Sequence, residues 1–222
     1  MKIVAAKKIL KAHDQLAAEN RGRFMEQGLY GVNLVGSPGC GKTTLLEALV
    51  RQLSGRMSWA VIEGDIAGQI DAERVEALGV PVIQINTDGM CHLDASMVSA
   101  ACENFDTGGA DVLWIENVGN LVCTAGFDLG EHLRIAALSV AEGDDKLVKY
   151  PAIFQRSDAL VITKLDLLPY TNFDLARVRA DMQRLAPQAE VFTVSALKGE
   201  GMPTVADWLW QKRQSLTRKE TG

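Results

Sequence analysis

The sequence predicts an α/β protein in which helices cover both faces of a mostly parallel central sheet. Two observations support this fold class. Short apolar runs alternate with amphipathic segments along almost the whole chain. Strands and helices that alternate in this way build parallel sheets, because each crossover returns the chain to the same edge. A glycine-rich loop also separates the first apolar run from the amphipathic segment after it, which is typical of a phosphate-binding turn.

The predicted elements follow one another without a repeat, a low-complexity tract or a linker. A first helix is predicted over residues 3–27 from apolar residues at helical spacing, namely Ile3, Ile9, Leu10, Leu16 and Phe24. Buried strands are predicted at residues 30–36, 59–64, 80–85, 111–117, 133–140, 159–164 and 190–196. Further helices are predicted at residues 42–53, 71–78, 93–105, 173–185 and 202–214. We therefore expect a helical lead-in at residues 1–28 and one α/β domain at residues 29–222.

Composition excludes several classes of protein. The chain has 222 residues, 47% of them hydrophobic, which is enough for the core of one medium domain. Its formal net charge of −5 and the lack of a basic run argue against a nucleic-acid partner. Lysines interrupt the apolar start too early for a signal peptide, and no apolar run is long enough to span a membrane. Four widely spaced cysteines are typical of cytosolic thiols, so we expect a cytoplasmic protein.

The loop after the first predicted strand matches the Walker A pattern. Its predicted nucleotide-binding residues are Gly36, Ser37, Pro38, Gly39, Cys40, Gly41, Lys42, Thr43 and Thr44. The glycines allow backbone N–H groups to surround phosphate oxygens at the start of a helix. Lys42 is expected to reach the β and γ phosphates, and Thr43 to give its hydroxyl to Mg²⁺. Cys40 is interpreted as a small residue that the loop tolerates.

A second motif, Thr163-Lys164-Leu165-Asp166, indicates which base is bound. The Asp166 carboxylate can accept hydrogen bonds from both N1–H and the exocyclic amine of guanine, whereas adenine would leave it unpaired. An unpaired buried acceptor costs about 1–3 kcal/mol, which is enough to select GTP over ATP. The Lys164 stem is expected to pack on the base, and the segment Ser195-Ala196-Leu197 to place a backbone donor near it. Taken alone, the tetrapeptide could also be an ordinary strand end.

Acidic residues follow two of the predicted strands, at the edge where nucleotides bind in parallel sheets. Asp65 and Glu116 suit magnesium, since this hard ion takes one or two carboxylates and keeps several waters. Gly119 is expected to donate its N–H to the γ-phosphate and so to sense its loss. Asp71 is a candidate for positioning the attacking water; a solvated carboxylate at a helix start is an equally good interpretation.

Cys91 and His92 are adjacent in a chain with four cysteines and three histidines. Thiolate and imidazole ligands suit ions such as Zn²⁺ and Ni²⁺. A buried thiol beside an incidental imidazole is the alternative, because free cysteine is often a core residue. The pair alone does not decide between the two.

From about residue 14 onward the chain resembles the hydrogenase nickel-insertion accessory GTPases, the HypB family. The matching strings include "GSPGCGKTTLL", "CHLDA", "IENVGNLVC", "FDLGEH" and "DLLPY". The resemblance implies a P-loop GTPase of the class that dimerises around nucleotide, with residues 29–222 forming the GTPase domain that carries a metal site. It also implies a homodimer, a partner nickel chaperone (HypA) and delivery of Ni²⁺ to the large-subunit precursor of [NiFe]-hydrogenase.

The same resemblance implies that Cys91, His92 and Cys123 form the metal site for Ni²⁺ or Zn²⁺. Three ligands leave a position open, which suits a transfer site or one shared across a dimer. The chain departs from the family pattern in two places. It has neither a Cys-rich nickel motif nor a His-rich tract near its start, and Thr163 replaces the usual Asn of the guanine motif.

These observations favour a slow GTPase that converts GTP to GDP and phosphate and uses the nucleotide state to change metal affinity. The residues expected to act in hydrolysis are Lys42, Asp71, Glu116 and Gly119. One alternative is a nucleotide-gated, metal-binding adaptor without significant hydrolysis. Another, a small-molecule kinase, is disfavoured by the guanine motif and by the lack of an evident acceptor-site motif.

Overall fold

The computed structural model describes residues 4–66, 68 and 70–220 of the chain, with side-chain surroundings for residues 11–66, 68 and 70–216. Ile3 and the side chains of Ile9 and Leu10, on which the first predicted helix partly depends, lie outside these described parts. The described residues form one seven-stranded, parallel sheet in the order β3-β2-β4-β1-β5-β6-β7. The strands are β1 (Tyr30–Gly36), β2 (Trp59–Asp65), β3 (Val82–Asn86), β4 (Val112–Glu116), β5 (Leu133–Ser139), β6 (Ala159–Thr163) and β7 (Glu190–Thr193). The predicted fold class, a parallel sheet between helices, is confirmed.

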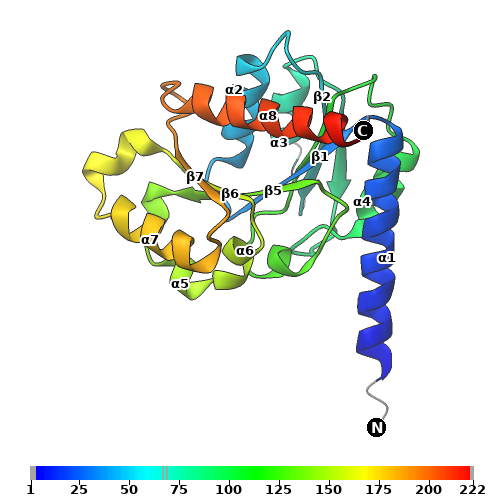
Figure 1. The fold of residues 1–222 in the computed structure, drawn as a ribbon, viewed down its shortest axis with the longest axis horizontal. Helices are drawn as coiled ribbons and strands as arrows, with labels where there is room; N and C mark the ends of the chain where they lie inside the picture. The colour runs from blue at the N-terminus through cyan, green and yellow to red at the C-terminus, as the bar shows by residue number, and fades with distance from the viewer. Residues whose placement is uncertain (1–3, 67, 69, 221–222) are drawn as a thin grey trace.

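The helices lie in two layers on either side of the sheet (Figure 1). The α-helices are α1 (Val4–Glu26), α2 (Lys42–Gln52), α3 (Ile70–Glu76), α4 (Ala95–Glu103), α5 (Lys146–Lys149), α6 (Pro151–Gln155), α7 (Leu175–Leu185) and α8 (Met202–Glu220). Short 3-10 turns are η1 (Cys123–Gly126), η2 (Val140–Glu142) and η3 (Leu165–Tyr170). Helices α5 and α6 were not predicted from the sequence. In the described part of the chain, no helix has the length and apolar character needed to cross a bilayer.

Side chains that alternate along the strands build a core on each face of the sheet. Val32 and Leu34 of β1 pack on one face with apolar residues of α2, α3 and α8. Val35 points to the other face and joins the cluster under α5, α6 and α7. A third cluster on that second face lies under α1 and α4, with Phe24 of α1 fully buried in it. Both faces of the five inner strands are therefore buried, which explains their nearly continuous apolar sequence, whereas the edge strands β3 and β7 are only partly buried.

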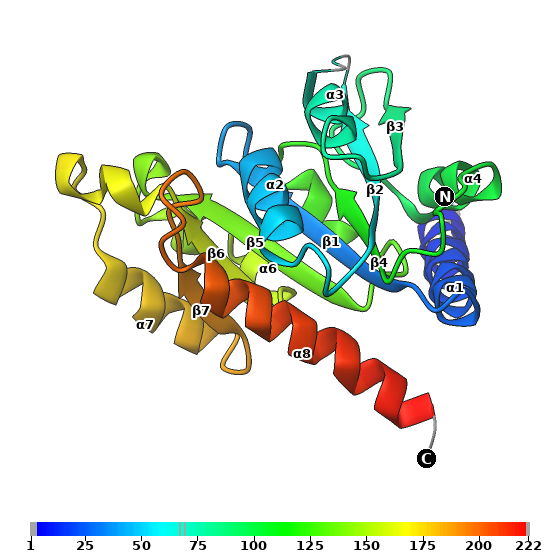
Figure 2. The ribbon, with the colours of Figure 1, turned by 90° about the horizontal axis from the view of Figure 1, so that it is seen from above.

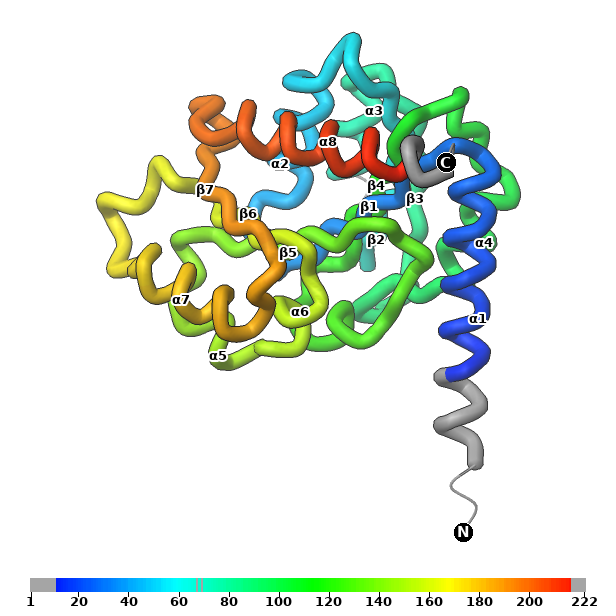
Figure 3. Tube along the Cα trace, in the orientation of Figure 1, coloured from blue at the N-terminus to red at the C-terminus, as the bar shows by residue number. Residues whose placement is uncertain are grey.

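The first and last helices lie on different faces of the sheet. Helix α1 packs beside α4 at the β3 side of the sheet, whereas α8 crosses the opposite face against α2 (Figure 2). The tube in Figure 3 shows the same arrangement, with α1 and α4 side by side at one end of the molecule. All seven strands run in one direction, so their carboxyl ends meet at a single edge. The predicted site residues follow those ends.

Candidate functional site

The phosphate loop, residues 36–44, runs from the end of β1 into the first turn of α2. Gly39 and Gly41 have φ of 72° and 95°, a region that favours glycine. A Cβ on Gly36 would lie 2.7 Å from both the Ala137 carbonyl oxygen and the Cys40 sulfur, so the strand end also needs glycine. Cys40 is fully buried, and burial raises the pKa of its thiol to about 11. It therefore stays protonated and packs as a small apolar side chain.

The guanine motif is attached directly to the phosphate loop. The Thr163 hydroxyl donates to the Cys40 carbonyl at 2.5 Å, and the Lys164 ammonium donates to the Gly39 carbonyl at 2.6 Å. Thr163, which replaces the usual amide of this motif, thus makes a side-chain bond to the loop. The phosphate loop is also bound through Ser37, whose hydroxyl donates to the carboxylate of Glu142.

A cavity of about 230 Å³ opens beside the phosphate loop at the ends of β2 and β4. Its lining includes Lys42, Asp65, Asp71 and Glu116, all four predicted from the sequence to act near phosphate. The Thr43 hydroxyl donates to Glu116 at 2.8 Å, so two predicted magnesium ligands are in contact. The other carboxylate oxygen of Glu116 is buried and, among the described residues, has no hydrogen-bond partner.

Glu63 is a cavity residue that sequence reasoning missed. It pairs with Glu116 in the register of β2 and β4, and one of its oxygens is also buried without a partner among the described residues. Burial, and then the neighbouring Glu116 and Asp71, raise the pKa of Glu63 to about 9. Burial also raises the pKa of Glu116 to about 7, against the opposing effects of Lys42 and Thr43. The sequence signal is a glutamate near the carboxyl end of both β2 and β4, which are neighbours in the sheet although β3 separates them in the chain.

The two aspartates of this cavity are already engaged by neighbouring groups. The Asp65 carboxylate accepts from the backbone N–H groups of Ile66 and Gly68, at 2.6 and 2.8 Å. Asp71 lies in an ion pair with Arg74 at 2.9 Å, and Arg74 also donates to Glu47 and to the Thr44 hydroxyl. Asp71 therefore lines the cavity as expected from the sequence, but its carboxylate is held by an arginine.

Residues 116–119, here called the phosphate-side loop, run from β4 along the phosphate loop. A Cβ on Gly119 would lie 2.9 Å from the backbone nitrogen and Cα of Pro38, so only glycine permits this approach. One residue on, the Asn120 N–H donates to the Gly36 carbonyl at 2.9 Å. The phosphate-side loop is thus in direct backbone contact with the loop predicted to hold the phosphates.

A second cavity, of about 300 Å³, lies on the other side of the phosphate loop. It is lined by Gly41, Thr44, Thr163, Lys164, Asp166, Leu167, Ala196 and Leu197. Asp166 accepts a hydrogen bond from the buried Ser195 hydroxyl at 2.6 Å, and this bond lowers the pKa of the carboxyl. Lys164 has φ of 55°, an unusual conformation for a residue with a side chain. Of the residues predicted to hold the base, four therefore share one cavity with the start of α2, namely Lys164, Asp166, Ala196 and Leu197. Ser195 is fully buried and reaches this cavity only through its bond to Asp166.

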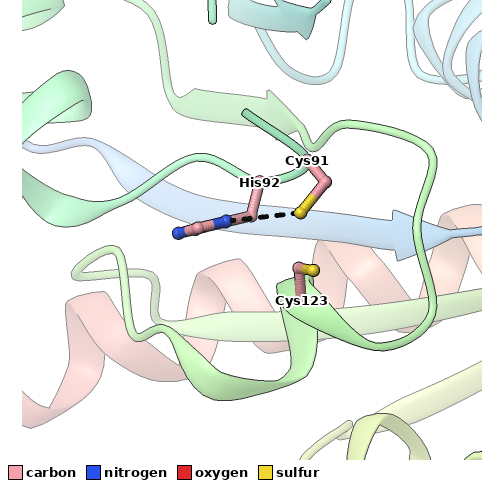
Figure 4. A group of neighbouring side chains, drawn as sticks. All are labelled: Cys91, His92 and Cys123. Atoms are coloured by element: carbon pink, nitrogen blue, oxygen red, sulfur yellow. Dashed lines mark hydrogen bonds between the residues drawn. The ribbon is translucent and has the colours of Figure 1, made fainter. Parts of the chain in front are cut away.

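Cys91, His92 and Cys123 come together although two segments supply them (Figure 4). One potential ligand atom from each residue lies within 4.8 Å of the others, and Cys91 Sγ lies 3.9 Å from His92 Nδ1. Cys91 and His92 occupy an irregular segment between β3 and α4. Adjacent side chains there can face the same way, which regular helix or strand geometry would prevent.

Local contacts hold each of these three residues. Cys123 begins η1, where the Asn120 side chain accepts from the N–H groups of Val122 and Cys123 at 2.7 and 2.9 Å. The His92 ring stacks on Phe127, with ring centres 3.9 Å apart and planes 17° apart. Burial lowers the pKa of His92, which favours the neutral ring that a metal ligand needs. A hydrogen bond between the side chains of Cys123 and Cys91 raises the pKa of the Cys123 thiol.

Known proteins of similar sequence and structure indicate the family of this chain. Residues 31–193 match the family model described as CobW/HypB/UreG, nucleotide-binding domain. A hydrogenase maturation factor HypB of Azotobacter vinelandii is 50% identical over 211 residues, covering 95% of this chain and 69% of that protein. The structure of HypB from Helicobacter pylori in complex with nickel has a TM-score of 0.87 at 40% identity, covering 92% of this chain and 96% of that one. For hydrogenase maturation factor HypB from Archaeoglobus fulgidus, the TM-score is 0.85 at 34% identity, covering 91% and 99% of the two chains. This chain therefore belongs to the HypB family of hydrogenase maturation factors, P-loop GTPases of the CobW/HypB/UreG nucleotide-binding group.

Proposed function

We propose that this protein is a GTP-hydrolysing metallochaperone that assists nickel insertion into [NiFe]-hydrogenase. One observation carries the proposal. Cys123, a candidate metal ligand, lies four residues after Gly119, and Gly119 lies against the phosphate loop. A change at the γ-phosphate can therefore reach the metal site through a few residues of one segment. The nucleotide state would then set the affinity for the metal cargo.

In this proposal GTP occupies the two cavities, with its phosphates in the loop and guanine against Asp166. Lys42 compensates charge on the β and γ phosphates, and the Gly119 N–H senses the γ-phosphate. A magnesium ion fits this cavity because Glu116 has a buried, unpartnered oxygen, which a hard cation satisfies. Thr43, Asp65 and Glu116 are the residues that would hold it. The ion would neutralise phosphate charge during hydrolysis.

We propose that hydrolysis is slow and serves as a timer. Asp71 is the candidate for positioning water, and its carboxylate is held in the ion pair with Arg74. It would need to leave this ion pair to engage a water molecule. The same ion pair favours the alternative, a nucleotide-gated adaptor without significant hydrolysis. Phosphate release, with Lys42→Ala as the inactive control, distinguishes the two: turnover above that of the variant excludes the adaptor.

The cargo is a divalent ion held by Cys91, His92 and Cys123, with Ni²⁺ proposed as the delivered ion and Zn²⁺ as a competitor. Both ions accept thiolate and imidazole ligands. Three protein ligands leave room for a fourth ligand from water, a second copy of the chain or an acceptor. Delivery would involve a homodimer, a HypA nickel chaperone and the hydrogenase large-subunit precursor. The four cysteines are free thiols, which suits a reducing compartment such as the cytoplasm.

The proposal is tested by titrating the protein with Ni²⁺ in the presence of GDP and of a non-hydrolysable GTP analogue. A chromophoric chelator that competes for the ion reports the affinity. We expect one high-affinity ion per chain and different affinities in the two nucleotide states. Alanine at Cys91, His92 or Cys123 should remove most of the affinity, whereas Cys102→Ala serves as a control outside the metal site. Equal affinities in both states would contradict nucleotide-controlled delivery and leave the GTPase assignment intact.

A further inference from the structure

Leu93, which directly follows His92, is held by both segments that line the phosphate cavity. Its side chain is fully buried and packs against Gly64 at the end of β2. A Cβ on Gly64 would lie 2.7 Å from Leu93 Cδ1, so the contact depends on that glycine. The neighbours of Gly64 are the cavity residues Glu63 and Asp65. The residue after the Cys-His pair is thus packed into the strand end that borders the phosphate site.

The backbone of Leu93 is bound to the phosphate-side loop as well. Its N–H donates to the Asn117 side-chain oxygen at 3.1 Å, and that oxygen also accepts from the Val118 N–H at 3.0 Å. Two backbone donors on one oxygen fix the orientation of the amide. Asn117 is 1% exposed, so neither bond is readily replaced by water. The loop that approaches the phosphates therefore holds the segment that carries His92.

A buried chain of polar side chains continues from Asn117 to the other side of His92. The Asn117 amide donates to Asn33 at 3.4 Å, and the Asn33 amide donates to Glu131 at 3.1 Å. Glu131 is ion-paired with the buried Arg134, which donates to the Phe127 carbonyl at 2.5 Å. Phe127 is the ring on which His92 stacks. Asn117 is thus connected to His92 both through Leu93 and through Phe127.

We propose that Asn117 is the positioning residue that transmits the nucleotide state to the metal site. This inference rests on the proposed function, because it names the route of the coupling proposed there. A shift of the phosphate-side loop moves the Asn117 amide, which draws the Leu93 N–H and with it His92. Because His92 directly precedes Leu93, this displacement alters the separation of His92 from Cys123. Asn117 lines the phosphate cavity, but in this role it is a ligand of neither the metal nor the nucleotide.

The quantity that tests this role is a ratio of two affinities. Ni²⁺ affinity is measured by chelator competition with GDP and with the non-hydrolysable GTP analogue, for the full chain and each variant. The wild-type ratio should differ from one by about 5-fold to 150-fold, the usual range of coupling between two sites.

Asn117→Ala should bring the ratio to within about twofold of one. Asn117→Asp keeps an acceptor for Leu93 and should retain most of the coupling. Asn33→Ala removes the acceptor of the Asn117 amide but leaves the bond from Asn117 to Leu93, so it should reduce the coupling only in part.

Asn20→Ala is the matched control. Asn20 is also 1% exposed, and its amide donates to the Ala95 and Leu129 carbonyls, close to the metal segment but not to the phosphate-side loop. It should weaken Ni²⁺ binding equally in both states and leave the ratio unchanged. Loss of coupling in Asn20→Ala as complete as in Asn117→Ala would overturn the inference, as would a wild-type ratio retained by Asn117→Ala. A wild-type ratio of one would instead overturn the proposed function.

Discussion

At the scale of single residues, we propose that Asp166 determines which base is bound. Its carboxylate is oriented by the Ser195 hydroxyl and faces the cavity beside Thr44 and Lys164. Replacing Asp166 with Asn would set an amide against the guanine donors but pair well with the carbonyl of xanthine. We expect Asp166→Asn to weaken GTP binding by about tenfold to a hundredfold and to strengthen binding of xanthosine triphosphate. Competition binding measures both, and an unchanged GTP preference would contradict the role of Asp166.

A second residue-scale prediction concerns acid stability. His132 accepts the Gly31 N–H at 2.9 Å and stacks on Tyr30. Burial, followed by Arg21 and Arg213, lowers the pKa of His132 to about 4. Between pH 6.5 and 4 the unfolded chain therefore binds a proton that the folded protein does not. The contribution of neutral His132 to folding stability is therefore fully present above pH 6.5 and is lost as the pH drops toward 4.

The measurement is urea unfolding at about pH 7.5 and about pH 5 for the wild type and for His132→Gln. Because glutamine keeps an acceptor but does not titrate, the variant should lose less stability on acidification, by about 1 kcal/mol after allowance for solvent screening. An equal loss in both proteins would mean that His132 is protonated in the folded state at the lower pH.

Single residues also show what the sequence alone can predict. The phosphate loop and the guanine motif are contiguous strings, so their residues can be named from the sequence. Glu63 and Asn117, in contrast, lie beside residues that are distant in the sequence, namely Glu116 and Leu93. Glu63 matters because β2 pairs with β4 in a register that sets it opposite Glu116. No local pattern encodes that register, so neither residue was predicted.

At the scale of elements, the phosphate-side loop is held against the phosphate loop by a glycine contact. Gly119→Ala would place a Cβ 2.9 Å from the Pro38 backbone and force the two loops apart. We expect GTP-analogue affinity to fall about tenfold or more, with GDP affinity little changed, because only the triphosphate needs the Gly119 N–H. Equal losses for the two nucleotides would place Gly119 outside γ-phosphate sensing. Gly126→Ala, where a Cβ meets no atom within 4 Å, is the control.

The elements were predicted unevenly. All seven strands were found, because apolar runs buried on both faces give a strong local signal. Residues 146–155 were not recognised as the short helices α5 and α6. Each is about one turn long, too short to show helical periodicity, and Pro151 at the start of α6 divides them. Their stability comes from packing under β5 and β6, with Leu147, Ile153 and Phe154 fully buried.

At the scale of the whole molecule, the sheet order explains why the two candidate sites are adjacent. β4 lies between β1 and β2, so the phosphate-side loop stands between the phosphate loop and the strand end that contacts Leu93. The alternation of strands and helices predicts a parallel sheet but not which strands are neighbours. The meeting of Cys91 and His92 with Cys123 follows from that order. The residues alone leave open whether Cys91 and His92 belong to a metal site or are a buried thiol beside an incidental imidazole.

The last prediction concerns the dimer that we propose to form with nucleotide. Exposed apolar side chains stand next to site residues in the sequence: Ile66, Ile70, Met90 and Val122 are 46%, 74%, 44% and 64% exposed. Ile66 lines the phosphate cavity, and exposed apolar residues of this kind favour a surface that a second copy covers. With Mg²⁺ and the GTP analogue, light scattering should give the mass of a dimer, and with GDP that of a monomer.

Val122→Glu should lower the dimer affinity by about tenfold or more, because association would bury an unpaired charge. Met25→Glu, an exposed apolar position (41%) before β1 and away from the carboxyl edge, should dimerise like the wild type. A Val122→Glu variant that still dimerises fully would mean that any dimer uses another face, and the fourth position at the metal would then need a ligand from elsewhere.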